Sequence, residues 1–243
     1  MPRANRYLVP GRTYHVRRRC HDRKFLFRFA VDRDAYRGML RDRSERYGIS
    51  ILNYCITSNH THLLVRASES EAAVSKFMQS LEGDFAQHYN LRKKRHGAFW
   101  NERYHATMID GGDYLWRCLK YIDLNMVRAG VVSHPREWSW TGYQELVGER
   151  KRYRLIDRER LFELLGGRQE DEFRFNYARA IRDAVQCHEF TREARWGESL
   201  AVGSADFVRE VGGQIRNRME VEIIEESNRP GVWVVREATP AYA

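Results

Sequence analysis

The chain has little of what would indicate a secreted or membrane protein. Its 243 residues include four cysteines, no two of which have the spacing of a redox motif or a zinc site. No stretch approaches the roughly 18 consecutive apolar residues of a membrane span. The basic N-terminus also lacks the apolar segment of a secretion signal. We therefore expect reduced thiols, no membrane partner and a cytoplasmic location.

Acidic residues are scarce in the first quarter of the chain. Residues 1–66 contain 15 Lys and Arg against 5 Asp and Glu, whereas residues 67–243 contain 27 against 28. The formal charge of +9 therefore comes from the N-terminal end. Positive charge concentrated in one region favours a polyanionic partner such as nucleic acid, and a solvated surface is the alternative.

The order of predicted elements is typical of an α+β domain. Strands and helices follow one another as β-α-β-β-α-β-α, and the first six match a ferredoxin-like antiparallel sheet with helices on one face. Asp32 is the expected N-cap of the first helix, and Gly48 ends it. The predicted elements are 13–19, 32–47, 49–57, 60–66, 70–90, 106–109 and 113–128.

The sequence changes character after Gly130. Helical patterns cover residues 155–165 and 170–187, another begins at Ser204, and one short β-like run covers residues 232–235. We interpret residues 1–130 as one domain and residues 131–243 as a mainly helical C-terminal extension, whose role the sequence leaves open.

Two histidines enter the predicted strand 60–66 two positions apart. His60 and His62 share one face of the strand, about 6–7 Å apart at Cα, because side chains alternate between the two faces. Neutral imidazoles at that distance can bind one divalent cation and leave positions open for substrate oxygens. The pattern His-x-His also arises by chance, so structural histidines remain the alternative.

A tyrosine and an asparagine lie one helical turn apart in the predicted helix 113–128. Tyr121 and Asn125 are off its apolar stripe and share one face, about 6 Å apart along the axis. An amide oxygen at this position could complete a metal site beside a nucleophile. By spacing alone, a boundary tyrosine and an exposed asparagine are the favoured interpretation.

Five segments together resemble the single-tyrosine HUH transposases, and among these most closely the REP-associated tyrosine transposases. The resemblance covers roughly residues 7–145. It rests on the combination of His-x-His after Asn59 with Tyr-Ile-x-x-Asn before Val-Arg-Ala-Gly. The segments are, in order, YHVRRRCHDRKFLF, TSNHTHLLV, MQSLEGDFAQHYN, GAFWNERYHATMI and YLWRCLKYIDLNMVRAGVV.

The resemblance implies a role for each of the four singled-out residues. His60, His62 and Asn125 would hold Mg²⁺ or Mn²⁺, and Tyr121 would be the nucleophile. Two positions depart from the family pattern. Thr61 stands where a bulky hydrophobic residue is usual, and Met126 stands where proline often follows the asparagine. We expect the first to change packing but not activity, and the second to let the helix continue for a turn.

The implied activity is nicking and rejoining of single-stranded DNA at palindromic repeat hairpins, through a 5′-phosphotyrosine intermediate. The resemblance further implies a monomer in preference to a dimer, located with the nucleoid. The alternatives are a domesticated hairpin-binding protein that no longer cleaves and a metal-dependent RNA-processing nuclease.

Basic residues near the first strand and in a later turn are the candidates for DNA contacts, and their binding should be sensitive to salt. Phe99, Trp100 and Tyr104 could stack on unpaired bases, and a place in the core is the alternative. We treat His15 and His105 as structural. The DNA-binding candidates are Arg17, Arg18, Arg19, Arg23, Lys24, Arg92, Lys93, Lys94 and Arg95.

Overall fold

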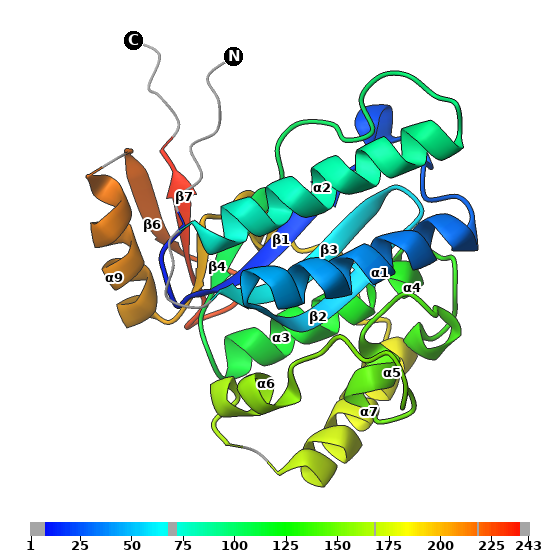
Figure 1. Ribbon diagram of the computed structural model, residues 1–243. Helices are drawn as coiled ribbons and strands as arrows, with labels where there is room; N and C mark the ends of the chain where they lie inside the picture. Colours follow the sequence, from blue (N-terminus) through cyan, green and yellow to red (C-terminus); the bar gives the residue numbers. More distant parts are fainter. Residues whose placement is uncertain (1–7, 68–71, 168, 218, 239–243) are drawn as a thin grey trace.

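The computed structural model describes residues 8–67, 72–167, 169–217 and 219–238, and it has the expected α+β fold. Its described strands form one mostly antiparallel sheet in the order β2-β3-β1-β4-β5-β7-β6 (Figure 1). The first four strands in this order form the predicted ferredoxin-like arrangement. The strands are β1 (Thr13–Arg19), β2 (Ile49–Ile56), β3 (His60–Ala67), β4 (His105–Ile109), β5 (Ala201–Gly203), β6 (Val221–Glu225) and β7 (Trp233–Glu237).

Helices lie on both faces of this sheet. The helices of the ferredoxin-like unit, α1 (Ala30–Tyr47) and α2 (Ala73–Arg92), cover one face, as predicted (Figure 1). The next helix, α3 (Asp113–Asp123), lies on the opposite face. Glu82 of α2 contacts Arg18, whereas Tyr121 of α3 packs against His15, and alternating residues of β1 point to opposite sides. The third helix therefore brings its side chains to a face that α1 and α2 leave open.

Two helix boundaries differ from the sequence expectation. Phe29, and not Asp32, precedes α1, and the buried Asp32 carboxylate pairs with Arg92 at the end of α2. The predicted helix 113–128 is divided at Leu124 (φ −76°, ψ 3°) into α3 and α4 (Asn125–Arg128). The predicted start of α2 at Ser70 lies outside the described residues.

The C-terminal extension continues the same sheet. Its strand β5 pairs in parallel with β4, and β7 joins β5 to β6, so the sheet runs across the predicted boundary at residue 130. Only β7 had a sequence signal, because β5 has three residues and β6 is largely exposed. The helices that follow α4 are η2 (Pro135–Glu137), α5 (Tyr143–Leu146), α6 (Arg158–Leu164), α7 (Glu170–Gln186), α8 (Arg195–Glu198) and α9 (Ala205–Arg216), and η1 (His21–Arg23) precedes α1.

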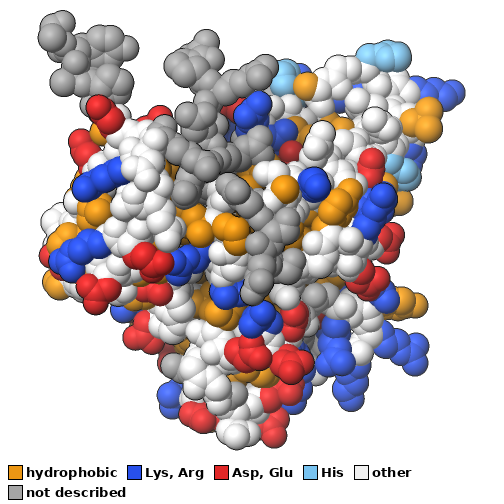
Figure 2. Space-filling model, turned by 60° about the vertical axis from the view of Figure 1, so that its left-hand side comes forward, with side chains coloured by type: hydrophobic (Ala, Val, Ile, Leu, Met, Phe, Trp, Pro, Cys, Tyr) orange, Lys and Arg blue, Asp and Glu red, His pale blue; other side chains and the backbone are white. Residues whose placement is uncertain are grey.

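Charge is mixed on the extension, as the near-neutral composition of residues 67–243 requires. The lower part of Figure 2, where α6 and α7 lie, shows acidic and basic side chains interspersed. The four cysteines are unpaired thiols. Within the described residues, no helix combines the length and the apolar character that crossing a bilayer requires.

Candidate active site

One face of the central strands carries the polar residues of the candidate site. In the antiparallel pair of β1 and β3, Arg17 is opposite His62 and Arg19 is opposite His60. Residues directly opposite each other project from the same face, and so does every second residue along a strand. His15 therefore joins these four side chains on the face that α3 covers.

The two ring nitrogens of His62 have different partners. Its Nδ1 lies 2.8 Å from Nε2 of His15, and its Nε2 lies 3.0 Å from the amide nitrogen of Asn125. The side-chain oxygen and nitrogen of asparagine are assigned from such contacts, and turning the amide would place Oδ1 at this position. The structure thus brings Asn125 to His62, although the two are 63 positions apart in the chain.

His60 is oriented by the turn that precedes it. Its Nδ1 lies 2.7 Å from Oδ1 of Asn59 and 2.9 Å from Oγ1 of Thr57. These oxygens accept the proton when it is on Nδ1, which leaves the Nε2 lone pair available. The rings of His60 and His62 are perpendicular, with centroids 4.9 Å apart.

Burial keeps these histidines neutral. Desolvation and then the charge of nearby arginines lower the pKa of His60 and of His15 to about 3. Burial, followed by the neighbouring histidines, also lowers the pKa of His62. Since a cation binds the unprotonated imidazole nitrogen, the histidines are in the ligating form at neutral pH.

Tyr121 lies beside the histidines. The centroid of its ring is 6.0 Å from that of His62 and 6.1 Å from that of His15. The guanidinium carbon of Arg128 lies 4.2 Å from the Tyr121 ring centroid, and the Trp196 ring lies 6.0 Å away. The Tyr121 hydroxyl donates no hydrogen bond to another described residue. Burial raises the pKa of the phenol, and the charges of Arg128 and Arg17 oppose that rise.

A buried carboxylate fixes the helix that carries Tyr121. Asp123 accepts hydrogen bonds from the hydroxyls of Thr141 at 2.5 Å and Tyr177 at 2.6 Å. Both donors belong to the extension, and burial raises the pKa of Asp123 to about 7. The extension therefore sets the position of α3 over the sheet.

The predicted metal ligands fit a divalent cation by their donor chemistry. Two cis ligands of an octahedral ion with bonds of about 2.1 Å are about 3.0 Å apart, and His62 Nε2 and the Asn125 amide terminus have this separation. Two imidazoles and one amide leave positions for water and phosphate oxygens. Among the described residues, no group of three or more His, Cys, Asp or Glu could hold a metal. The predicted ligand set is not such a group, because its third member is the amide of Asn125.

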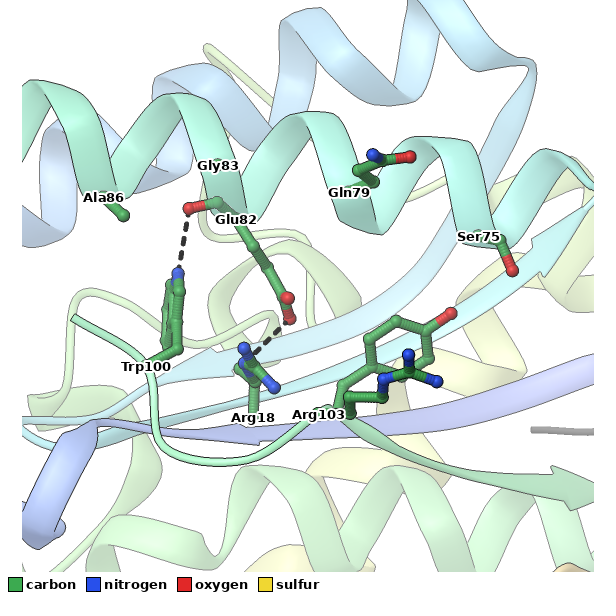
Figure 3. A pocket seen from close by; sticks show the side chains of 9 residues that line it. Arg18, Ser75, Gln79, Glu82, Gly83, Ala86, Trp100 and Arg103 are labelled. Carbon is green, nitrogen blue, oxygen red and sulfur yellow. Dashed lines mark hydrogen bonds and ion pairs between the residues drawn. The ribbon is translucent and has the colours of Figure 1, made fainter. Parts of the chain in front are cut away.

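The predicted DNA-binding residues divide between the two faces. Arg17 and Arg19 lie on the histidine face, and the Arg17 guanidinium donates a 3.0 Å hydrogen bond to the Gly197 carbonyl. Arg18 lies on the opposite face, 3.2 Å from the Glu82 carboxylate and over the Trp100 ring (Figure 3). Arg18 thus faces away from the histidines, and its contact with a DNA phosphate stays a prediction.

The other basic candidates lie at the end of the sheet where α1 begins and α2 ends. Lys24 pairs with Asp22 at 3.1 Å, and Arg23, which lies between them, has a left-handed backbone conformation (φ 56°). Arg92 is paired with Asp32, whereas Arg95 donates to the Asn90 side chain and two backbone carbonyls. Arg92 and Arg95 thus stabilise the loop. The remaining candidates, Lys93 and Lys94, are exposed.

The aromatic candidates for base stacking are in the core. Phe99, Trp100 and Tyr104 are buried, as their alternative interpretation held. Phe25 and Phe29 are exposed instead, by 67% and 50%, and Lys93 lies 4.5 Å from the Phe29 ring centroid. Sequence reasoning missed this pair because neither residue lies in a periodic pattern.

Sequence reasoning also missed the residues that support the site. His15 was interpreted as structural, and its contact with His62 is a structural role that orients a candidate ligand. The alternation of His15 and Arg17 with Tyr14 and Val16 in β1 was the available signal. His105 is structural as well, with Nε2 3.0 Å from the Ser199 carbonyl oxygen. Arg128 lies in the Val-Arg-Ala-Gly segment of the resemblance, although its place beside Tyr121 was not expected, and Trp196 gave no local signal.

Comparison with known proteins finds relatives of the N-terminal half of this chain. Residues 9–125 match the sequence model of the family described as transposase IS200 like. A protein of Haemophilus influenzae, named as a REP-associated tyrosine transposase, is 23% identical over 121 residues, 46% of this chain and 69% of that protein.

A solved structure has a related fold. It is a REP-associated tyrosine transposase bound to a REP hairpin, and it matches with a TM-score of 0.55 and 16% identity. The match covers 61% of this chain and 86% of the other. The resemblance found in the sequence is therefore confirmed: residues 9–125 of this chain match the IS200-like transposase family.

Proposed function

We propose that this protein nicks and rejoins single-stranded DNA beside palindromic hairpins, with Tyr121 as the nucleophile. The observation that carries the proposal is the assembly of Tyr121, His62 and Asn125 from two distant segments on one face of the sheet. The similar proteins bear the names of REP-associated tyrosine transposases, and one of them was solved with a REP hairpin.

The reaction we propose exchanges one phosphodiester for another. The Tyr121 phenol oxygen forms a bond to phosphorus, and the bond from phosphorus to the 3′ oxygen breaks. The phenol loses one proton, and the 3′ oxygen of the released strand gains one to become a hydroxyl. Because the phosphotyrosine retains the bond energy, a different 3′-hydroxyl can reverse the step without ATP. Arg128 and Arg17 favour the phenolate, since their charges lower its pKa against the effect of burial.

His60, His62 and Asn125 are the residues that would hold the cation in this proposal. Bound Mg²⁺ or Mn²⁺ would polarise the phosphate and stabilise the leaving oxygen. Asn59 and Thr57 orient His60, and His15 orients His62, so the ligands are positioned before any cation arrives. One chain supplies the complete set, which supports action as a monomer.

Positive charge beside the site supports binding of the DNA backbone. Arg17 and Arg19 lie next to the histidines, and Arg23 and Lys24 continue the basic surface from there. The exposed rings of Phe25 and Phe29 are available for stacking on unpaired bases. We propose that phosphates follow the arginines and that unpaired bases of the hairpin meet these two rings.

Substitution of the nucleophile tests the proposal. The protein is incubated with labelled hairpin oligonucleotides from the DNA beside its own gene, and covalent adducts are separated under denaturing conditions. The wild type should form an adduct. Tyr121→Phe should form none, because the attacking oxygen is gone, and should bind the hairpin with unchanged affinity. Tyr114→Phe is the matched control, since Tyr114 is on the same helix and bonds to the Gly231 carbonyl.

The alternatives give different results in the same assay. Hairpin binding by the wild type without any adduct would support a domesticated binding protein. Cleaved product without an adduct would indicate a nuclease that uses water. Adduct formation by Tyr121→Phe would contradict the assignment of the nucleophile.

A further inference from the structure

A cavity of about 800 Å³ adjoins the nucleophile, a size typical of sites for one small ligand. Tyr121, Leu124 and Arg128 line it on the side of α3 and α4. Residues 188–193 and 228–230 of the extension line the opposite side. His60, His62 and Asn125 are not among its lining residues, so the cavity lies beside the phenol and apart from the candidate metal ligands.

Cations predominate in the lining of this cavity. Arg117, Lys120 and Arg128 line it from one side, and Arg229 lines it from the other. Of the acidic residues, Glu189 is exposed, and Glu193 is already paired with Arg195 and Arg229. A ligand with a negative charge is therefore favoured.

The wall formed by the extension is fixed by buried ion pairs. Arg195, only 4% exposed, contacts Glu193 in the first lining segment and Glu226, two residues before the second. Arg128 connects this wall to the nucleophile, because it donates to the carbonyls of Tyr121 at 3.1 Å and Phe190 at 3.5 Å. The cavity is thus a built feature of the fold, with one side formed by the helix that carries Tyr121.

We propose that this cavity binds the nucleotide whose 5′ phosphate is transferred to Tyr121, and that the extension thereby selects the cleavage site. The inference rests on the proposed function. In such a displacement the leaving oxygen lies on the far side of phosphorus from the attacking oxygen. The retained nucleotide, by contrast, stays within one phosphate of the phenol throughout. A cavity that adjoins Tyr121, bears net positive charge and is too small for a duplex suits that nucleotide.

Phe190 and Asn228 are the lining residues best placed to contact its base. Both belong to the extension, one offering an aromatic ring and the other an amide. Contacts of this kind discriminate between a base and its absence, since stacking contributes about 1–3 kcal/mol per base. Arg117 and Lys120 are on the side of α3 and suit the phosphate.

The experiment combines a change in the protein with a change in the DNA. Once the scissile phosphate is mapped, adduct formation is measured against oligonucleotide concentration, with either the native base or an abasic site on its 3′ side. For the wild type, loss of this base should raise the half-saturating concentration about tenfold or more. Asn228→Ala and Phe190→Ala should each remove most of this difference, and hairpin affinity should stay constant.

The controls isolate the cavity. Phe175→Ala removes a ring that is 66% exposed on α7 and should keep the full discrimination. An abasic site on the 5′ side should affect all variants equally. The nucleotide site alone would be overturned if loss of the 3′ base left the half-saturating concentration of the wild type unchanged. It would also be overturned if both cavity variants kept the full difference between the native base and the abasic site. Absence of any adduct with the wild type would overturn the proposed function together with it.

Discussion

The two faces of the central strands differ in function, although alternate residues of the same strands form both. On one face, β1 and β3 present His15, Arg17 and His62 to the helix that carries Tyr121. On the other face the intervening residues Val16 and Leu63 are fully buried under α1 and α2. Alternation thus lets neighbouring residues in one strand serve chemistry and stability separately.

This separation has a cost on the chemical face. Buried histidines and half-buried arginines there have pKa values shifted against their charged forms, with desolvation as the largest cause. The apolar face carries no such penalty and supplies most of the packing. Changes to the first face should therefore alter reaction and binding, whereas changes to the second should alter the free energy of unfolding.

Removal of divalent cations should have the largest effect and should act on the histidine face alone. A chelator should abolish adduct formation, and added Mn²⁺ or Mg²⁺ should restore it. Because a ligand that binds only the folded state stabilises it, saturating Mn²⁺ should also raise the melting temperature of the wild type. His62→Ala should lose this rise. Undiminished adduct formation in the chelator would contradict the predicted metal dependence.

Substitution of His15 tests whether the partner of a ligand matters as much as we infer. His15→Leu should lower Mn²⁺ affinity or the rate of adduct formation about 10- to 100-fold, since it removes the group that orients His62. Titration calorimetry and the adduct assay measure the two quantities. His15→Gln can still accept a hydrogen bond and should recover part of the loss, which a purely packing role for His15 would not produce.

A change at Leu63, which follows His62 but lies on the other face, should alter stability and leave the reaction unchanged. Leu63 is fully buried, and Leu63→Ala should lower the free energy of unfolding by about 2–5 kcal/mol in urea titrations. The remaining folded protein should form adducts at the wild-type rate. A loss of metal affinity in this variant as large as that of His15→Leu would show that the two faces are not separable.

The smallest expected effect concerns neighbouring arginines. Arg19→Ala should remove one phosphate contact. The slope of log affinity against log salt concentration should therefore become smaller by about 0.7, the value for one contact with a single strand. Arg18→Ala should leave this slope unchanged, because Arg18 faces the other side and pairs with Glu82. Fluorescence anisotropy at several salt concentrations gives both slopes. Equal changes in the two variants would show that DNA reaches both faces.

The elements of the N-terminal half were largely predictable because their signals are local. The strand 13–19 and the helix after Asp113 follow from residue type and periodicity within the segments. The strands β5 and β6 were not predictable, because the pairing of β5 with β4 and of β6 with β7 stabilises them more than their own short sequences do. The break at Leu124, which separates Asn125 from the preceding helix, was not predictable from local sequence either.

The sequence by itself determined which side chains could take part in chemistry. His60 and His62 had to share a face because strand geometry alternates, and the helical pattern predicted Tyr121 and Asn125 on one side of the segment that follows Asp113. Only the tertiary structure decided that these two pairs meet, that His15 supports His62, and that the extension forms a cavity beside the phenol. Periodicity acts over a few residues, whereas these contacts depend on how helices pack on the sheet, to which the whole core contributes.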